Sequence, residues 1–233
     1  MSVFARSILA AGTLDAARLV LGALLIHDSG PERRVGRIVE VEAYVGEDDM
    51  ASHTRMGRTK RNSVMFGPPG VAYVYLVYGM YYCLNIVTEA SGRPAALLVR
   101  AVEPIEGAAE MRLARIRAAL ARPNRHNSDP DRARKHIAGL PALRLASGPG
   151  LVCAAFSIDR SHDGLDLLDG NSELRIEEAP PGYGPIAVAT GPRIGIGYAP
   201  DPWLSHAWRF YDSGSGAVSG PGLGVATRRK ATA

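Results

Sequence analysis

Residues 71–88 read VAYVYLVYGMYYCLNIVT, and this stretch decides the fold that the sequence predicts. Aromatic and β-branched residues on both sides of Tyr78 and Gly79 predict two strands, over roughly 71–77 and 80–88. Gly79 can adopt the positive φ that a tight hairpin turn requires. The stretch holds five of the nine tyrosines of a chain with only 6% aromatic residues. Two interpretations stay open: the tyrosines pack across an ordinary sheet, or they stack on a flat partner.

The rest of the chain alternates predicted helices and strands, without an internal repeat. We expect helices over 13–21, 107–121 and within 147–158, strands over 23–28, 35–46 and 93–104, and short strands LRIEE, IAVAT, RIGIG and WRFYD after residue 165. Residues 31–34 are expected as a turn, 47–70 as a long ordered loop, 122–136 as a flexible basic loop and 222–233 as a flexible tail. These elements predict one mixed α+β domain over residues 1–233.

The composition is that of a globular protein, with 46% hydrophobic and 21% charged residues among 233. Cys83 and Cys153 have apolar neighbours, and we expect them to be small buried residues in a reducing compartment rather than a disulfide. The sequence has no C-x-x-C pair and no cysteine–histidine cluster, so we do not expect a structural zinc site. It also lacks a signal peptide and a run of about 18 apolar residues, which predicts a cytoplasmic protein without a membrane span.

The net charge of +4 and the pI of about 9.2 give a mild basic bias. The excess is concentrated in RMGRTKR (55–61) and in the arginine-rich residues 112–136. For either run alone, a solvated helix face or flexible basic loop is as good an interpretation as a contact with phosphates. Both together favour contact with a phosphate backbone.

Two carboxylates stand in VEVEAY, residues 39–44. In an extended strand Glu40 and Glu42 point to the same face, about 7 Å apart. One interpretation is a solvated strand face, which the hexapeptide alone favours. The other is a catalytic carboxylate beside an ion-pair partner, as hydrolysis of a glycosidic bond requires.

Four further side chains are candidates for a site. His53 lies in the polar loop, where a lone histidine more often has no special role. Arg100 lies within the apolar run AALLVRAV, so its guanidinium needs anionic partners: Glu40, Glu42 or a bound phosphate. The amide of Asn85 needs hydrogen-bond partners within the strand core, and it can also recognise the edge of a base. Tyr78, at the predicted hairpin tip, is costly to expose unless it inserts into a partner.

These features together fit an enzyme that acts on a nucleobase in a duplex. They are a basic surface, a projecting aromatic side chain, tyrosines behind it and a nearby carboxylate. The base must leave the stack, a wedge must fill the gap and an aromatic pocket must hold the base.

Four segments then resemble a known family: GRIVEVEAYVGEDDMASH (36–53), YVYLVYGMYYCLNIV (73–87), LLVRAVEP (97–104) and SGPG (147–150). They resemble the alkyladenine (3-methyladenine) DNA glycosylases of the human type, with similarity from about residue 13 to 211. The resemblance implies a curved, mainly antiparallel sheet with surrounding helices and a protruding β-hairpin. It also implies an enzyme of base excision repair, associated with the nucleoid in a prokaryote. We expect a monomer, because the projecting Tyr78 must approach DNA unobstructed.

The resemblance assigns catalytic roles to three residues. Glu42 would activate the water that attacks the sugar C1′. Arg100 would help to hold that water or the phosphate of the flipped nucleotide. His53 would contact the base and help to hold the water.

Four residues would contact the extruded base or the duplex. Tyr44 and Tyr75 would stack on the extruded alkylated or deaminated purine, and Asn85 would line its pocket. Tyr78 would enter the minor groove of double-stranded DNA in place of the flipped nucleotide. The product would be an abasic site, formed without a cofactor or a metal.

Leu151 departs from the family pattern, because many members have lysine there, and a phosphate contact or a helix-cap charge would be missing.

Two alternative functions remain. One is a non-catalytic module of the same fold that binds damaged DNA, and the other is a hydrolase of free nucleosides, for which Tyr78 would have no use.

Overall fold

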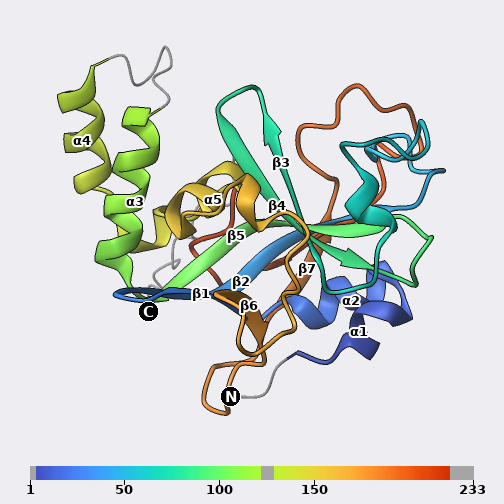
Figure 1. The fold of residues 1–233 in the computed structure, drawn as a ribbon, viewed down its shortest axis with the longest axis horizontal. Coiled ribbons are helices and arrows are strands. Elements are labelled where there is room, and N and C mark those ends of the chain that lie inside the picture. Colours follow the sequence, from blue (N-terminus) through green and yellow to red (C-terminus); the bar gives the residue numbers. More distant parts are fainter. Residues whose placement is uncertain (1–3, 122–128, 221–233) are drawn as a thin grey trace, which may run out of the picture.

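Eight strands form one antiparallel sheet in the computed structural model, which describes residues 4–121 and 129–220. Six of them follow the order β3-β4-β5-β2-β1-β6, while β8 pairs with both β2 and β7. The strands are β1 Leu24–Ser29, β2 Glu32–Val45, β3 Ala72–Val77, β4 Tyr81–Thr88, β5 Ala95–Glu106, β6 Leu174–Glu177, β7 Val188–Gly191 and β8 Arg209–Asp212. The sheet curves through the middle of the molecule (Figure 1).

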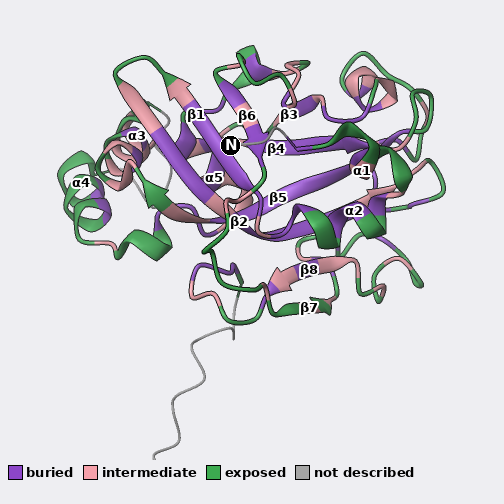
Figure 2. Cartoon of the chain, turned by 90° about the horizontal axis from the view of Figure 1, so that it is seen from below, coloured by how far each residue is buried: buried purple, intermediate pink, exposed green. Residues whose placement is uncertain are grey.

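The helices surround this sheet, which confirms the predicted single α+β domain (Figure 1). They are α1 Arg6–Ala11, α2 Thr13–Val20, α3 Ala108–Ala121, α4 Pro130–Ala138 and α5 Pro149–Phe156, and short 3₁₀ turns are η1 Ser63–Phe66, η2 Ala142–Arg144 and η3 Arg160–His162. Helix α5 packs on β4 and β5, α3 packs on α5, and α4 packs on α3. Strands β2, β4 and β5 are buried for most of their length (Figure 2).

Strand β2 is the centre of the sheet. One edge pairs with β5 along most of its length, while the other pairs first with β1 and then with β8. Two register shifts flank Glu40 in the β2–β5 ladder. The bulged strand presents both Glu40 and Glu42 to the protein interior, where each side chain is fully buried.

Strands β3 and β4 form the predicted hairpin, which projects from the body of the protein (Figure 1). At its tip Tyr78 has a φ of 51° and Gly79 a φ of 68°. Positive φ at both central positions is the requirement of a type I′ turn, and the Met80 N–H closes the turn by donating to the Val77 carbonyl at 3.1 Å. Further down β4, Tyr81 packs so closely on Gly150 of α5 that a β-carbon there would lie 2.8 Å from the tyrosine.

The predicted flexible loop over residues 122–136 is wrong for its second half, which forms α4. The Asp129 side chain caps this helix by accepting the backbone N–H groups of residues 131 and 132, and Pro130 occupies the first turn. Ala133 and Ile137, four residues apart, bury one face against the protein. The charged residues of the segment had hidden this start signal. Residues 122–128 and the predicted tail over 222–233 lie outside the described residues.

Two smaller predictions are also wrong. The turn expected over residues 31–34 is only Gly30 and Pro31, because Gly30 supplies a φ of 77° and the ladder resumes at Glu32. The strand expected over RIGIG (193–197) is a loop, whose Arg193 is buried among acceptors and whose Ile194 N–H bonds to a side chain.

Both cysteines are free and buried, as expected. No helix among the described residues has the length and the apolar character that a membrane span needs.

Candidate active site

A cavity of about 350 Å³ opens beside the β3–β4 hairpin. Six of the seven predicted site residues line it: Tyr44, His53, Tyr75, Tyr78, Asn85 and Arg100. The seventh, Glu42, is fully buried and bonds to three residues that line the cavity. Residues from β2, the loop after it, the hairpin and β5 are therefore brought to one place.

Glu42 lies at the end of β2 with both carboxylate oxygens engaged. Oε1 accepts the Ile194 N–H at 2.7 Å and lies 3.1 Å from Nη1 of Arg100, and Oε2 accepts the Tyr44 hydroxyl at 3.0 Å. Burial raises the pKa of Glu42, although the Arg100 charge and these two hydrogen bonds offset part of that rise. A carboxylate with a raised pKa directly behind a cavity wall is suited to accept a proton.

Arg100 lies between the two carboxylates predicted as its partners. Its Nε donates to Oε1 of Glu40 at 3.0 Å, and its Nη2 donates to Ser219 Oγ at 3.2 Å. Glu40 also accepts Arg209 and the Ser219 N–H. The guanidinium is thus fixed by ion pairs, and it holds the Glu42 carboxylate in place.

Tyr44 is held from behind by a buried arginine. The Arg193 guanidinium lies 4.7 Å from the centre of the Tyr44 ring, within the range of a cation–π contact. Asp49 binds Arg193 through two contacts, of 2.5 and 2.9 Å, and both side chains are fully buried. Asp49 also accepts the N–H of Ala51, so one carboxylate anchors both the loop and the tyrosine.

His53 meets the tyrosines of β3 across the cavity. Its Nδ1 lies 3.0 Å from the Tyr73 hydroxyl, and its ring packs edge-on against Tyr75 with the centres 4.5 Å apart. Burial, with the charges of Arg61 and Arg55, lowers the pKa of His53 to about 4. The imidazole is therefore neutral at physiological pH.

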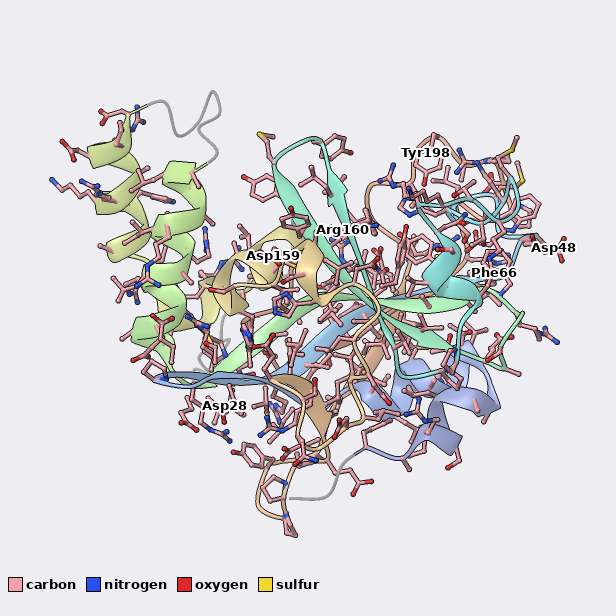
Figure 3. All side chains as sticks on the ribbon, in the orientation of Figure 1. Asp28, Asp48, Phe66, Asp159, Arg160 and Tyr198 are labelled. Carbon is pink, nitrogen blue, oxygen red and sulfur yellow. The ribbon has the colours of Figure 1, made fainter. Side chains whose placement is uncertain are left out.

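Asn85 and Tyr78 occupy opposite environments at this cavity. Asn85 is buried, and its Nδ2 donates one hydrogen bond to the Tyr73 carbonyl at 3.0 Å. Tyr78 is 83% exposed at the hairpin tip. Tyr198 stands on the neighbouring loop, 61% exposed, with its hydroxyl donating to the Ala51 carbonyl (Figure 3).

The basic stretch 55–61 forms part of the cavity rim. Its four cations are exposed, and Arg61 lies over the Tyr75 ring at 5.5 Å. The second basic run contributes less free charge than its sequence indicates. Arg112 and Arg115 each donate through Nη1 to two or three backbone carbonyls at the ends of α4 and η2 and just after them.

Asp49, Arg193 and Tyr73 are site residues that were not among the predicted ones. Arg193 is buried like Arg100, but its neighbours in GPRIGIG are mainly glycines, so its sequence context does not indicate burial as AALLVRAV does for Arg100. Leu151 lines a separate cavity of about 430 Å³ between the hairpin, α3 and α5. Its departure from the family pattern therefore does not touch the cavity of Glu42.

A family described as methylpurine-DNA glycosylase matches residues 7–216. The chain belongs to this family. Its curated relatives include proteins named "Putative 3-methyladenine DNA glycosylase" from Methanocella arvoryzae and Myxococcus xanthus. The first is 45% identical over 94% of this chain and 96% of its own, and the second is 42% identical over 99% of both.

A relative of the same name from Anaeromyxobacter dehalogenans is 44% identical over 90% of this chain and 83% of its own. Membership of the methylpurine-DNA glycosylase family confirms the resemblance and the predicted class of enzyme, a DNA glycosylase that hydrolyses N-glycosidic bonds.

Proposed function

We propose that this methylpurine-DNA glycosylase flips an alkylated or deaminated purine out of duplex DNA and hydrolyses its N-glycosidic bond with a water activated by Glu42. The observation that carries the proposal is the buried Glu42 carboxylate behind a cavity walled by Tyr44, His53 and Tyr75. The relatives are named for 3-methyladenine, which agrees with an alkylated purine as substrate.

The chemistry follows from the partners of Glu42. The water oxygen forms a bond to C1′ while a proton passes to the carboxylate, and the C1′–N bond breaks with its electron pair going to the base. A raised pKa makes Glu42 a better proton acceptor than an ordinary glutamate. Arg100 keeps the carboxylate aligned and is balanced by Glu40, so the site does not carry an excess positive charge against the oxocarbenium-like sugar.

The cavity walls favour a flat, electron-poor ring. Tyrosine faces attract cationic rings by about 0.5–2 kcal/mol, and 3-methyladenine and 7-methylguanine carry a positive charge. The neutral His53 adds no charge repulsion against such a base. Asn85 would select among purines, because its buried amide would clash with an exocyclic amino group such as the 2-amino group of guanine.

The hairpin tip and the rim fit the duplex. Tyr78 stands exposed on a tight turn and would fill the space left by the flipped nucleotide from the minor groove. Arg55, Arg58, Lys60 and Arg61 would contact phosphates beside it. A monomer suits this role, because a second subunit would not obstruct the approach of the hairpin tip to DNA.

Glu42→Gln is the decisive test of this function. Duplexes containing one hypoxanthine or ethenoadenine, and methylated DNA, are incubated with enzyme and treated with alkali, which breaks the strand at abasic sites. We expect cleavage by the wild type and a loss of at least about a hundred-fold in Glu42→Gln, the lower range for a lost general base. Lesion affinity should persist, since the amide keeps the size of the side chain.

Glu47→Gln is the matched control, because Glu47 is exposed in the adjacent loop. It should cleave like the wild type. Cleavage by Glu42→Gln at the wild-type rate would contradict the role of this carboxylate. Lesion binding without cleavage by the wild type on any substrate would instead favour the non-catalytic binding module.

A further inference from the structure

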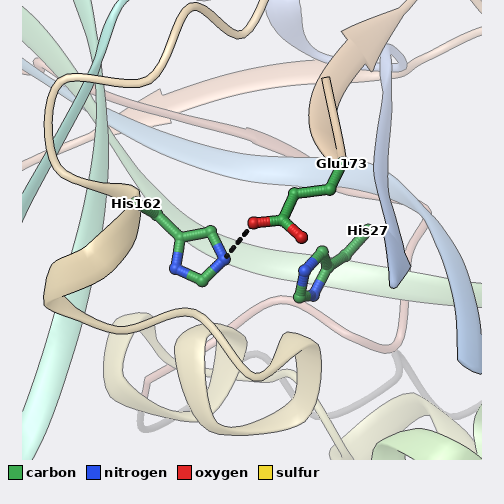
Figure 4. A group of neighbouring side chains, drawn as sticks. All are labelled: His27, His162 and Glu173. Carbon is green, nitrogen blue, oxygen red and sulfur yellow. Dashed lines mark ion pairs between the residues drawn. The ribbon is translucent and has the colours of Figure 1, made fainter. Parts of the chain in front are cut away.

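Two histidines and a glutamate, none of which lines the cavity beside Glu42, meet at one place (Figure 4). His27 belongs to β1, His162 ends η3, and Glu173 directly precedes β6. One nitrogen of each imidazole and one carboxylate oxygen all lie within 4.8 Å of one another. Both histidines are buried, whereas Glu173 is exposed and opens the cluster to solvent.

His162 carries the unexplained feature of this cluster. Its Nε2 is buried and, within the described residues, has no hydrogen-bond partner; the carboxylate of Glu173 lies 3.8 Å away. A buried polar nitrogen of this kind is costly unless something binds it. The three side chains converge on the space in front of that nitrogen (Figure 4).

We propose that His27, His162 and Glu173 bind a divalent transition metal ion of the Zn²⁺ class through two imidazole nitrogens and one carboxylate oxygen. Zn²⁺ prefers these ligands at about 2.0–2.2 Å in a tetrahedron, where ligand atoms stand about 3.4 Å apart. The three ligand atoms, which lie within 4.8 Å of one another, are therefore farther apart than in a bound site. A movement of the exposed Glu173 side chain can shorten the distances from its carboxylate to the two imidazoles. Water would complete the fourth position.

The hydrogen bond of His27 supports ligation. Nδ1 of His27 contacts the Phe156 carbonyl, which can only accept, so Nδ1 carries the proton and Nε2 presents a lone pair. Nδ1 of His162 lies 3.3 Å from a carboxylate oxygen of Asp159 and 3.2 Å from the Asp159 backbone nitrogen. Nδ1 accepts the Asp159 N–H, so the proton of the neutral ring is on Nε2. On binding, this proton moves from Nε2 to Nδ1, where the Asp159 carboxylate accepts it in place of the backbone hydrogen bond, and no proton is released.

Charge sets an upper limit on the affinity. Arg34 lies opposite His27 in the β1–β2 ladder and is buried, so its positive charge opposes a cation bound at His27. Its guanidinium pairs with Glu32, which reduces the repulsion that a bound cation would meet. Hard cations such as Mg²⁺ gain little from imidazole ligands and should not bind here.

The ion would connect opposite edges of the open sheet. Strand β3 is one edge of the sheet order and β6 the other. The segment around η3 covers β3, because Arg160, at the foot of the hairpin (Figure 3), donates to the Val74 carbonyl and Asp163 accepts the Val74 N–H. An ion coordinated by His162, His27 and Glu173 would connect this segment to β1 and β6. Binding should therefore stabilise the fold.

The test uses the full chain without an affinity tag, after treatment with a chelator. Zn²⁺ is titrated by competition with a chromophoric chelator, Co²⁺ is used as a spectroscopic probe of tetrahedral nitrogen and oxygen ligands, and Mg²⁺ serves as the negative ion. We expect one saturable Zn²⁺ site and a higher thermal midpoint in Zn²⁺ than in chelator. Glu173→Gln should weaken Zn²⁺ binding by about ten-fold or more and remove the thermal shift.

Glu178→Gln is the matched control on the same surface, since Glu178 is exposed just after β6, and it should bind like the wild type. His162→Gln should lose the site as well; if it unfolds, the exposed Glu173 carries the test. Excision by Glu173→Gln should equal that of the wild type. Absence of saturable Zn²⁺ binding, unchanged binding in Glu173→Gln, or binding without thermal stabilisation would each overturn the proposal.

Discussion

Asp49→Asn removes the counterion of a buried arginine while keeping the size of the side chain. Asp49 and Arg193 are both fully buried and joined by two contacts of 2.5 and 2.9 Å. Asparagine can still accept the Ala51 N–H, so the main change is an Arg193 charge left without its partner. Removing one partner of such a pair costs about 3–5 kcal/mol of unfolding free energy.

That loss is large against the roughly 5–15 kcal/mol that stabilises a typical domain. In a chain of this size it corresponds to a drop of roughly 6–20 °C in the thermal midpoint. Because Arg193 also lies over the Tyr44 ring, affinity for a lesion duplex should fall as well. Urea denaturation measures the first effect, and fluorescence anisotropy with a labelled duplex measures the second.

Asp48→Asn is the matched control, because Asp48 is the exposed neighbour in the same loop (Figure 3). It should change the free energy of unfolding by less than about 0.5 kcal/mol. The double variant Asp49→Asn/Arg193→Met should be less destabilised than the sum of its single variants, because the unpaired charge is gone. A cost for Asp49→Asn below about 1 kcal/mol would refute the view that this ion pair holds the cavity wall.

Three other predictions concern the cavity and the hairpin. Tyr78→Ser should weaken binding to a lesion duplex by about 1–3 kcal/mol without loss of stability, whereas Tyr183→Ser, on a distant loop, should bind normally; equal affinities in an anisotropy titration would count against the wedge. Single-turnover excision should fall as pH drops through the raised pKa of Glu42, at a higher pH than an ordinary glutamate would give. His53, with a pKa of about 4, is neutral throughout, so a shift of this profile in His53→Gln would contradict that assignment. Tyr73→Phe should cost about 1 kcal/mol in urea denaturation and slow excision, since His53 loses its hydroxyl partner; a wild-type rate would show that this contact does not position the imidazole.

The hairpin and the site motif are the parts of this protein that sequence alone could predict. The hairpin depends on local chemistry: strand-forming residues on both sides and a glycine that tolerates positive φ. The segment around Glu42, Tyr44 and His53 is continuous in sequence, so its pattern was sufficient to indicate a family. The caps of α4 were also local, and they were missed only because charged residues obscured them.

The partners of the buried charges were decided by the tertiary structure. The buried context of Arg100 predicted that anions must face it, and strand alternation placed Glu40 and Glu42 on one face. By contrast, the Ile194 N–H and the Asp49–Arg193 pair reach the site from a loop about 150 residues away in sequence. No local propensity encodes such a contact. It forms because a buried charge or amide must find a partner among whatever groups the folded sheet brings within reach.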